Sequence, residues 1–136
     1  MSDAPDFVDP ETAWIDYLTA QLQGTEWSMP VSNRTGETAP FVKLVSVGGD
    51  ELAAVVDDPW VACEVYGVDS DDAGRRIQAV RGIIRRAQGT TIAFGVNCKR
   101  VRQISGVASL PDPDHEGVRY SWTFAGALRP EMINEQ

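Results

Sequence analysis

The sequence predicts an α+β fold, a mixed, mostly antiparallel sheet of five to six strands with two main helices on one face. Two stretches repeat apolar residues at intervals of three and four positions, the spacing of an amphipathic helix. Several other stretches alternate apolar and polar residues, the pattern of half-buried strands. Turn-forming residues separate most of these strands, which favours antiparallel hairpins over a purely parallel sheet.

A chain of 136 residues is long enough for one core, and we expect a single domain over residues 1–136, with residues 1–8 as a flexible acidic arm. The net charge of −8 argues against a protein that holds nucleic acid through a basic face. The first residues lack the basic and apolar regions of a signal peptide, and no apolar run approaches membrane-spanning length. We therefore expect neither export nor a membrane partner.

The first predicted helix follows Asp9, a residue type suited to the N-cap, with Pro10 at the first helical position. Gly24 is expected to end it. Between these limits apolar residues recur every fourth position, at Trp14, Leu18 and Leu22. One side of this helix should therefore be buried.

The next segment carries weaker signals. Alternation over residues 27–31 predicts a short edge strand, because Pro30 lacks the N–H that a central strand uses. The polar, turn-rich residues 32–40 predict an exposed loop.

Three strands are predicted before the second helix, over residues 41–47, 52–56 and 60–66. Gly48-Gly49-Asp50 predicts a tight hairpin turn between the first two. Asp57-Asp58-Pro59 predicts the turn into the third strand. In that third strand alternate residues share one buried face, at Val61, Cys63 and Val65.

The second predicted helix follows a cluster of short oxygen-bearing residues over 69–72, which cap free N–H groups and suit the positive end of the helix dipole. Arg85 and Arg86 suit the last turn, and Gly89 is expected to end the helix. Its buried stripe is predicted at Ala73, Ile77, Val80, Ile84 and Ala87.

Beyond this helix, residues 91–98 predict a strand with Ile92, Phe94, Val96 and Cys98 inward. The alternation shifts over 99–103, which predicts a bulge. Residues 105–117 predict a second long loop, and 118–129 a final strand that Pro130 ends.

Two helices cannot cover both faces of such a sheet, so its other face or an edge is a candidate partner surface. Cations on the second helix and last strand, with outward aromatics, are candidate interface residues. The alternative is a solvated helix face with ordinary half-buried aromatics. The candidates are Arg75, Arg76, Arg85, Arg86, Arg119, Arg129, Trp60 and Tyr66.

No pattern predicts catalysis. His115, the one histidine, lies among three acidic residues, which suggests a metal or acid–base site, or simply a solvated loop. The cysteines Cys63 and Cys98 fall on inward strand positions, where we expect buried, reduced thiols, with a disulfide as the alternative. We therefore expect no catalytic residue, no metal ligand and no cofactor.

Several short motifs follow one another in a familiar order. They are Ala39-Pro40-Phe41-Val42, Gly48-Gly49, Asp57-Asp58-Pro59, the strand 61–67, the acid-capped helix 73–87, Leu110-Pro111-Asp112 and Arg119-Tyr120-Ser121-Trp122. Over residues 10–130 this order resembles the tail terminator (tail completion) proteins of bacteriophages with long, non-contractile tails, the siphoviruses.

The resemblance implies a non-enzymatic virion structural protein without a cofactor. It implies a ring, usually a hexamer, that caps the tail tube, ends tail polymerisation and offers the head–tail joining surface. The implied partners are other copies of the chain, the tail tube protein and a head-completion or neck protein, with DNA as passing cargo in the lumen. The implied location is the head–tail junction of the virion, after viral assembly in the host bacterial cytoplasm.

Two alternatives remain open. The first is that the chain is a head–tail connector or neck protein. The second is that it is a small ligand-binding or metal-dependent enzyme domain that uses the loop around His115.

Overall fold

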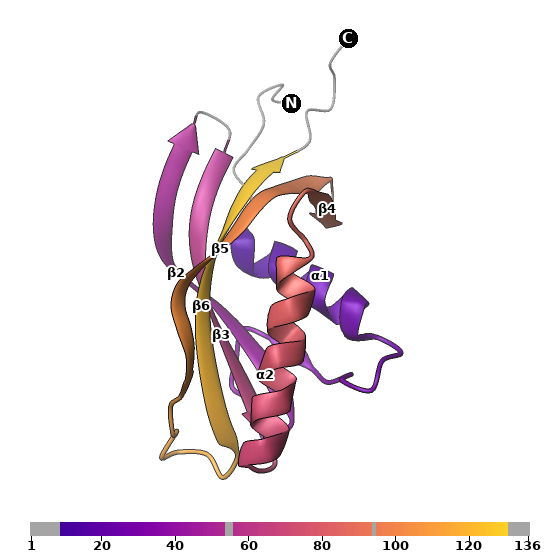
Figure 1. The fold of residues 1–136 in the computed structure, drawn as a ribbon, viewed down its shortest axis with the longest axis vertical. Coiled ribbons are helices and arrows are strands. Elements are labelled where there is room, and N and C mark those ends of the chain that lie inside the picture. Colours follow the sequence, from indigo (N-terminus) through magenta and orange to yellow (C-terminus); the bar gives the residue numbers. More distant parts are fainter. Residues whose placement is uncertain (1–8, 54–55, 94, 131–136) are drawn as a thin grey trace.

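The computed structural model describes residues 9–53, 56–93 and 95–130. These contain two helices and six strands, which confirms the predicted α+β fold (Figure 1). The elements are α1 (Pro10–Leu22), β1 (Val31–Ser32), β2 (Phe41–Ala53), β3 (Val56–Gly67), α2 (Ser70–Arg85), β4 (Thr90–Ala93), β5 (Val96–Ser109) and β6 (Val118–Pro130). The predicted acidic arm, residues 1–8, lies outside the described residues. Among those described, neither helix has the length and apolar character to cross a membrane.

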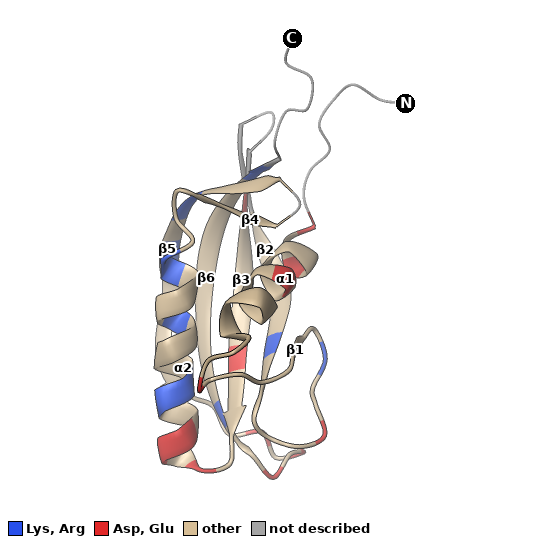
Figure 2. Cartoon of the chain, turned by 90° about the vertical axis from the view of Figure 1, so that its right-hand side faces the viewer, with Lys and Arg blue, Asp and Glu red and all other residues tan. Residues whose placement is uncertain are grey.

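The strands form one mixed sheet in the order β1-β2-β3-β6-β5-β4. The short pair β1–β2 is parallel, and the other four pairs are antiparallel. Both helices lie on one face of this sheet, as predicted (Figures 1 and 2). Their apolar stripes and the facing strand residues form one hydrophobic core.

The first helix starts where its sequence predicts. The carboxylate of Asp9 accepts hydrogen bonds from the N–H groups of Glu11 (3.1 Å) and Thr12 (3.5 Å), so it satisfies two of the free donors at the helix start. Trp14, Leu18 and Leu22 are buried, as their spacing predicts.

The second helix also follows its sequence signals. Asp69 accepts a hydrogen bond from the N–H of Asp72 (2.8 Å), and Gly89, with φ +82°, follows the helix end. All five residues of the predicted stripe, Ala73, Ile77, Val80, Ile84 and Ala87, are fully buried.

Trp14 brings α1 into close contact with the sheet. Its ring lies 5.0 Å from that of Phe124, edge to face, and a Cβ at Gly126 would meet it at 2.5 Å. One turn further along α1, the hydroxyl of Tyr17 donates to the carbonyl oxygen of Ile83 in α2 (3.0 Å). Helix α1 is therefore held against both β6 and α2.

The predicted turns around β2 and β3 are wrong. Gly48 and Gly49 lie inside β2, with φ of +113° and +137°, and the Asp57–Pro59 stretch lies inside β3. The pairing shifts register between Ser46 and Gly49, so the two glycines form a bulge instead of a hairpin turn. A Cβ at Gly49 would lie 2.6 Å from the Cα of Pro59, which explains why glycine is needed there. The structure thus has two long strands, β2 and β3, where the sequence predicted three shorter ones.

The predicted strand over 91–98 is also wrong, because β4 and β5 pair as a hairpin across Gly95, which has φ +75°. Phe94 lies outside the described residues. The predicted bulge is confirmed by register shifts between Cys98 and Arg100 and further along β5. Since β5 extends to Ser109, the second loop spans 110–117 rather than 105–117.

The segment before β2 is also less regular than predicted. The edge strand expected over 27–31 is reduced to the two residues of β1, while Met29 is buried against the core.

The contact at Gly126 gives a stability prediction. Gly126→Ala should lower the free energy of unfolding by about 1–3 kcal/mol, because the buried Trp14 has no room to move away from the added methyl group. Urea unfolding followed by circular dichroism measures the change.

Gly82→Ala is the matched control. The nearest atom to a Cβ at Gly82 is a terminal nitrogen of Arg86 at 3.6 Å, so there is room for the methyl group. Because alanine is the better helix former, this variant should gain up to about 1 kcal/mol. Equal effects of the two substitutions would contradict the packing described for Trp14.

Candidate functional site

Charge is unevenly distributed along this acidic chain. Residues 73–111 contain eight Lys and Arg residues and no Asp or Glu, although the whole chain has a net charge of −8. This stretch forms most of α2 together with β4 and β5. The fold therefore determines whether these cations gather in one place.

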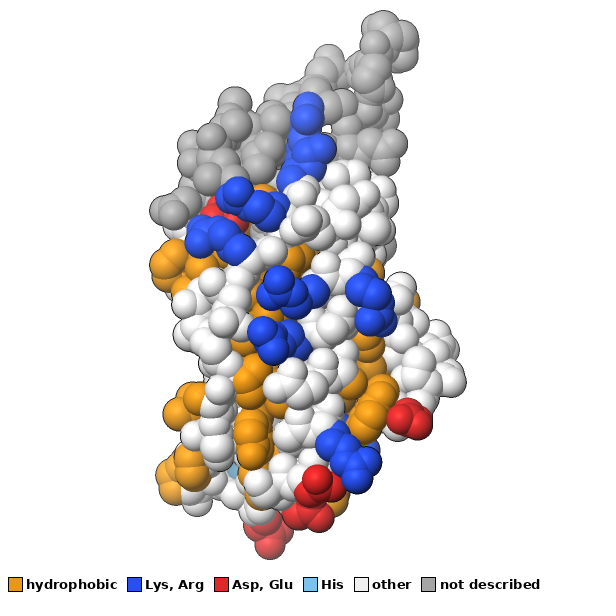
Figure 3. Space-filling model, in the orientation of Figure 1, with side chains coloured by type: hydrophobic (Ala, Val, Ile, Leu, Met, Phe, Trp, Pro, Cys, Tyr) orange, Lys and Arg blue, Asp and Glu red, His pale blue; other side chains and the backbone are white. Residues whose placement is uncertain are grey.

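The fold brings them onto one side of the molecule. The buried stripe of α2 turns Arg85 and Arg86 outward, and Lys99 and Arg100 are exposed on the neighbouring strand β5. A hydrogen bond from Arg81 to the side-chain oxygen of Gln103 (3.1 Å) joins α2 to β5. Figure 3 shows Lys and Arg side chains spread over this side. We define the basic flank by its residues Arg81, Arg85, Arg86, Lys99, Arg100 and Arg129.

Ion pairs distinguish four other arginines of the chain from these residues. Among the described residues, carboxylates pair with Arg75, Arg76, Arg102 and Arg119. No described carboxylate lies within 4.0 Å of a cationic group of the basic flank. The exposed members of the flank are Arg85, Arg86, Lys99 and Arg100. The guanidinium of Arg81 instead bonds Gln103 and lies over the ring of Trp122.

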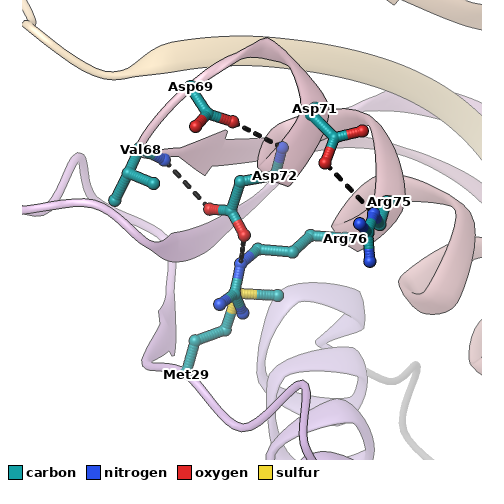
Figure 4. Close-up of polar contacts among 7 residues, drawn as sticks. All are labelled: Met29, Val68, Asp69, Asp71, Asp72, Arg75 and Arg76. Atoms are coloured by element: carbon teal, nitrogen blue, oxygen red, sulfur yellow. Dashed lines mark hydrogen bonds and ion pairs between the residues drawn. The ribbon is translucent and has the colours of Figure 1, made fainter.

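The arginines at the start of α2 serve the fold itself (Figure 4). Asp72 accepts a hydrogen bond from the N–H of Val68 (2.9 Å) and another from Nε of Arg76 (2.8 Å). Arg76 also contacts the sulfur of Met29 (3.6 Å) and lies over the ring of Trp27. This cluster fastens the helix start to the segment before β1.

The pKa of Asp72 is lowered by this arrangement. Partial burial raises the pKa, but the hydrogen bond from Val68 and the guanidinium of Arg76 outweigh burial. The ionised carboxylate is therefore favoured in the folded protein. By contrast, Arg75 and Asp71 form an exposed pair (3.2 Å) one turn away.

A buried carboxylate lies at the other end of the sheet. Asp58 of β3 is 1% exposed, and its Oδ2 accepts a hydrogen bond from Arg102 of β5 (2.6 Å), whose side chain is 41% exposed. The pair crosses β6, the strand between them. Arg102 therefore contributes to holding β5 and β3 in place.

The loop 110–117 folds back over the sheet face opposite the helices. The ring of His115 packs edge to face against Phe41 and Tyr66, with centroids 5.4 and 4.9 Å apart. Nδ1 of His115 accepts the N–H of Gly117 (2.8 Å), and the tautomer protonated on Nε2 donates to the carbonyl oxygen of Gly36 (3.0 Å). His115 thus joins two loops.

Hydrogen bonds from the sheet anchor the same loop. Tyr66 donates to Asp112 (2.9 Å), and Nε of Arg119 donates to the carbonyl oxygen of Leu110 (2.7 Å). Burial and the bond to Asp112 raise the pKa of Tyr66. The N–H of Asp114 and the hydroxyl of Tyr66 lower the pKa of Asp112. These contacts hold the loop 110–117 against the sheet.

The structure offers little for chemistry at the other residues considered. Cys63 and Cys98 are buried free thiols, as predicted, and burial raises both pKa values, that of Cys98 to about 11. Within the described ranges, no three His, Cys, Asp or Glu side chains are placed to hold a metal ion. The basic flank is therefore the candidate site, and its charge is complementary to an acidic surface.

The predicted interface residues therefore lie in different settings. Arg85, Arg86 and Arg129 belong to the basic flank, whereas Arg75, Arg76 and Arg119 pair within the chain. Trp60 is half-buried, and Tyr66 is fully buried under the loop 110–117. Sequence reasoning missed Lys99 and Arg100. The absence of acidic residues over 73–111 was the signal that could have found them.

Comparison with known proteins identifies a fold. No protein-family model matches the chain, and no curated protein matches it. Among solved structures, a chain described as "Virion of native gene transfer agent (GTA) particle" is similar, with a TM-score of 0.50 and 14% sequence identity. The match covers 82% of this chain and 84% of that chain. The α+β fold described above is therefore shared with a chain of a gene transfer agent virion.

The cluster around Asp72 gives a second prediction. Asp72→Asn should lower the free energy of unfolding at pH 7 by about 1–2 kcal/mol, because it weakens a charge-assisted cap and the tie to Arg76. Since the folded-state pKa lies below the unfolded value of about 3.9, this stabilisation is present above that pH. It should disappear as the pH falls through the folded-state pKa. Urea unfolding at pH 7 and at acidic pH measures it.

Asp71→Asn is the control for this experiment, since its pair with Arg75 is exposed. It should change stability by less than about 0.5 kcal/mol at either pH. A large, pH-independent loss in Asp72→Asn would show that the ionised form is not what matters.

Proposed function

We propose that this chain is a structural protein of a phage-like virion, and specifically a tail terminator that forms a ring on the end of the tail tube. The observation that carries this proposal is the fold shared along most of both chains with a chain of a gene transfer agent virion. The order of motifs over residues 10–130, which resembles tail terminators, supports the finer assignment.

The exposed surface supports an assembling protein. In the part of the chain that the structure describes, both helices lie on one face of the sheet, and the edge strands β1 and β4 are short, so most of β2 and β5 is left at the sheet edges. Such a chain has surface available for cyclic association. Arg85, Arg86 and Arg129, with the half-buried Trp60, are the proposed contact residues on this chain.

In this proposal the ring, usually hexameric in tail terminators, sits at the head–tail junction of the virion after assembly in the host cytoplasm. One side meets the tail tube protein and the other a head-completion or neck protein, while DNA passes through the lumen. A head–tail connector or neck role is the nearest rival. We propose no enzyme activity, because the hydrogen bonds of His115 hold loops together.

The test is assembly. The purified protein should elute as an oligomer in size-exclusion chromatography with light scattering and show rings in negative stain. Mixed with polymerised tail tubes, it should occupy one tube end and stop further growth when tube subunits are added. Tubes incubated without the protein are the control and should keep growing.

Two results would count against the proposal. A stable monomer that binds no tubes would contradict a ring-forming virion component. Rings that leave tube growth unchanged but bind the portal side of the head would favour the connector or neck role instead.

A further inference from the structure

The segments at the two edges of the sheet carry opposite net charge. Residues 9–53, which form α1, β1 and β2, contain seven acidic and two basic residues. Residues 73–111, which form most of α2 with β4 and β5, contain eight basic residues and no acidic ones. The strand order places β2 near one edge of the sheet and β5 near the other. The β1–β2 edge of the sheet is therefore the more acidic and the β5 edge the more basic, while α1 crosses the sheet between them and also contacts β4 and α2.

Figure 2 shows this distribution from the helix side, with basic residues along α2 and β5 and acidic residues on α1 and the loop after β1, although the start of α2 is acidic and basic residues also lie on β2 and in the loop after β1. We define the acidic flank as α1, β1, β2 and the loop 33–40. Among its acidic residues, Glu37 is exposed and Asp16 is half-buried. Glu26 is left out of the flank, because its neighbour Trp27 packs against Arg76 of α2. The acidic flank is thus a candidate complement to the basic flank.

We propose that the basic flank of one copy binds the acidic flank of the next copy, so that identical chains associate head to tail through oppositely charged sides. This inference rests on the proposed function, which needs a contact between copies but does not say which surfaces make it. A contact between two different surfaces repeats from copy to copy, and it closes into a ring when the rotation allows. Complementary potentials fix the partner and the orientation.

The edge of β5 indicates whether two copies would join by strand addition or through their side chains. The pairing of β5 with β6 shifts register at three places, and the N–H of Val101 is already bonded to the side chain of Gln88 (2.9 Å). Bulges and exposed cations are devices that oppose strand addition at an edge. The two copies therefore meet through side chains rather than by extending one sheet into the next.

A second copy fits the basic flank better than nucleic acid does. Duplex DNA is the obvious other polyanion, but a net charge of −8 repels it as a whole. A second copy brings an acidic surface of matching size on the same fold. DNA binding by the flank is therefore a defined alternative outcome of the test.

The test uses two charge-reversal variants of the full chain. Variant A carries Arg85→Glu, Arg86→Glu, Lys99→Glu and Arg100→Glu, so four of the six cations of the basic flank become anions and both flanks are net acidic. Variant B carries Asp16→Lys and Glu37→Lys, so the acidic flank loses its negative charge. Each variant alone should need at least about tenfold more protein than the wild type to reach half assembly, measured by light scattering and mass photometry.

An equimolar mixture of A and B should restore assembly, because each reversed flank then meets a reversed partner and each native flank a native one. The restored particles should contain A and B in equal amounts, read by tagging one variant. Asp114→Lys with Glu116→Lys is the matched control, because it makes the same charge change as B in the exposed loop 110–117. This control should assemble like the wild type, and circular dichroism confirms that all variants are folded.

The outcomes separate this inference from the proposed function. Rings formed equally well by A, B and the wild type would overturn the flank contact and leave the tail terminator proposal standing. A wild type that stays monomeric and leaves tubes uncapped would overturn both. Duplex DNA binding that is lost in A, with assembly unchanged in A, would assign the flank to DNA and overturn the inference.

Discussion

The close contact between Trp14 and the backbone at Gly126 positions the rest of the helix layer. The indole ring lies where any larger residue in β6 would place its Cβ, so α1 can reach the centre of the sheet. From there Trp14 packs against Phe124, and Tyr17 bonds the backbone of α2. Gly126 therefore sets how closely α1 approaches the sheet, and Tyr17 in turn ties α1 to α2. Because both helices are held on the same face, the sheet edges and the part of the opposite face that the loop 110–117 does not cover are left for other contacts.

This one-sided packing also decides where the charges lie. The stripe of α2 that must be buried leaves Arg85 and Arg86 on the outside, next to β5. Arg81 lies between them and the sheet, where it bonds Gln103 and lies over the ring of Trp122. The first turn of the same helix is different, because Asp71 and Asp72 neutralise the arginines one turn further on. A single helix therefore has a self-paired start and an outward-directed basic end.

Local signals predicted the helices and the buried strand faces, since caps and apolar spacing are properties of neighbouring residues. Gly48-Gly49 was misinterpreted because the same two glycines suit a hairpin turn and a bulge. The choice depends on Asp58 and Pro59, which face Gly49 only once β2 and β3 pair. The basic flank was found only in part for a similar reason. Arg85 and Arg86 stand out on their helix, but Lys99 and Arg100 join them only because the sheet order places β5 beside α2.

Net charge and local charge act at different distances, which reconciles an acidic chain with a basic flank. Beyond the screening length of about 8 Å at physiological salt, two copies present mainly their excess of negative charge and repel each other weakly. At contact, only the facing side chains matter. Most relative orientations then bring acidic surfaces together, whereas one orientation brings the basic flank against the acidic flank. Repulsion in the wrong orientations contributes to specificity as much as attraction in the right one. A net negative charge therefore makes a charge-directed contact between copies more selective.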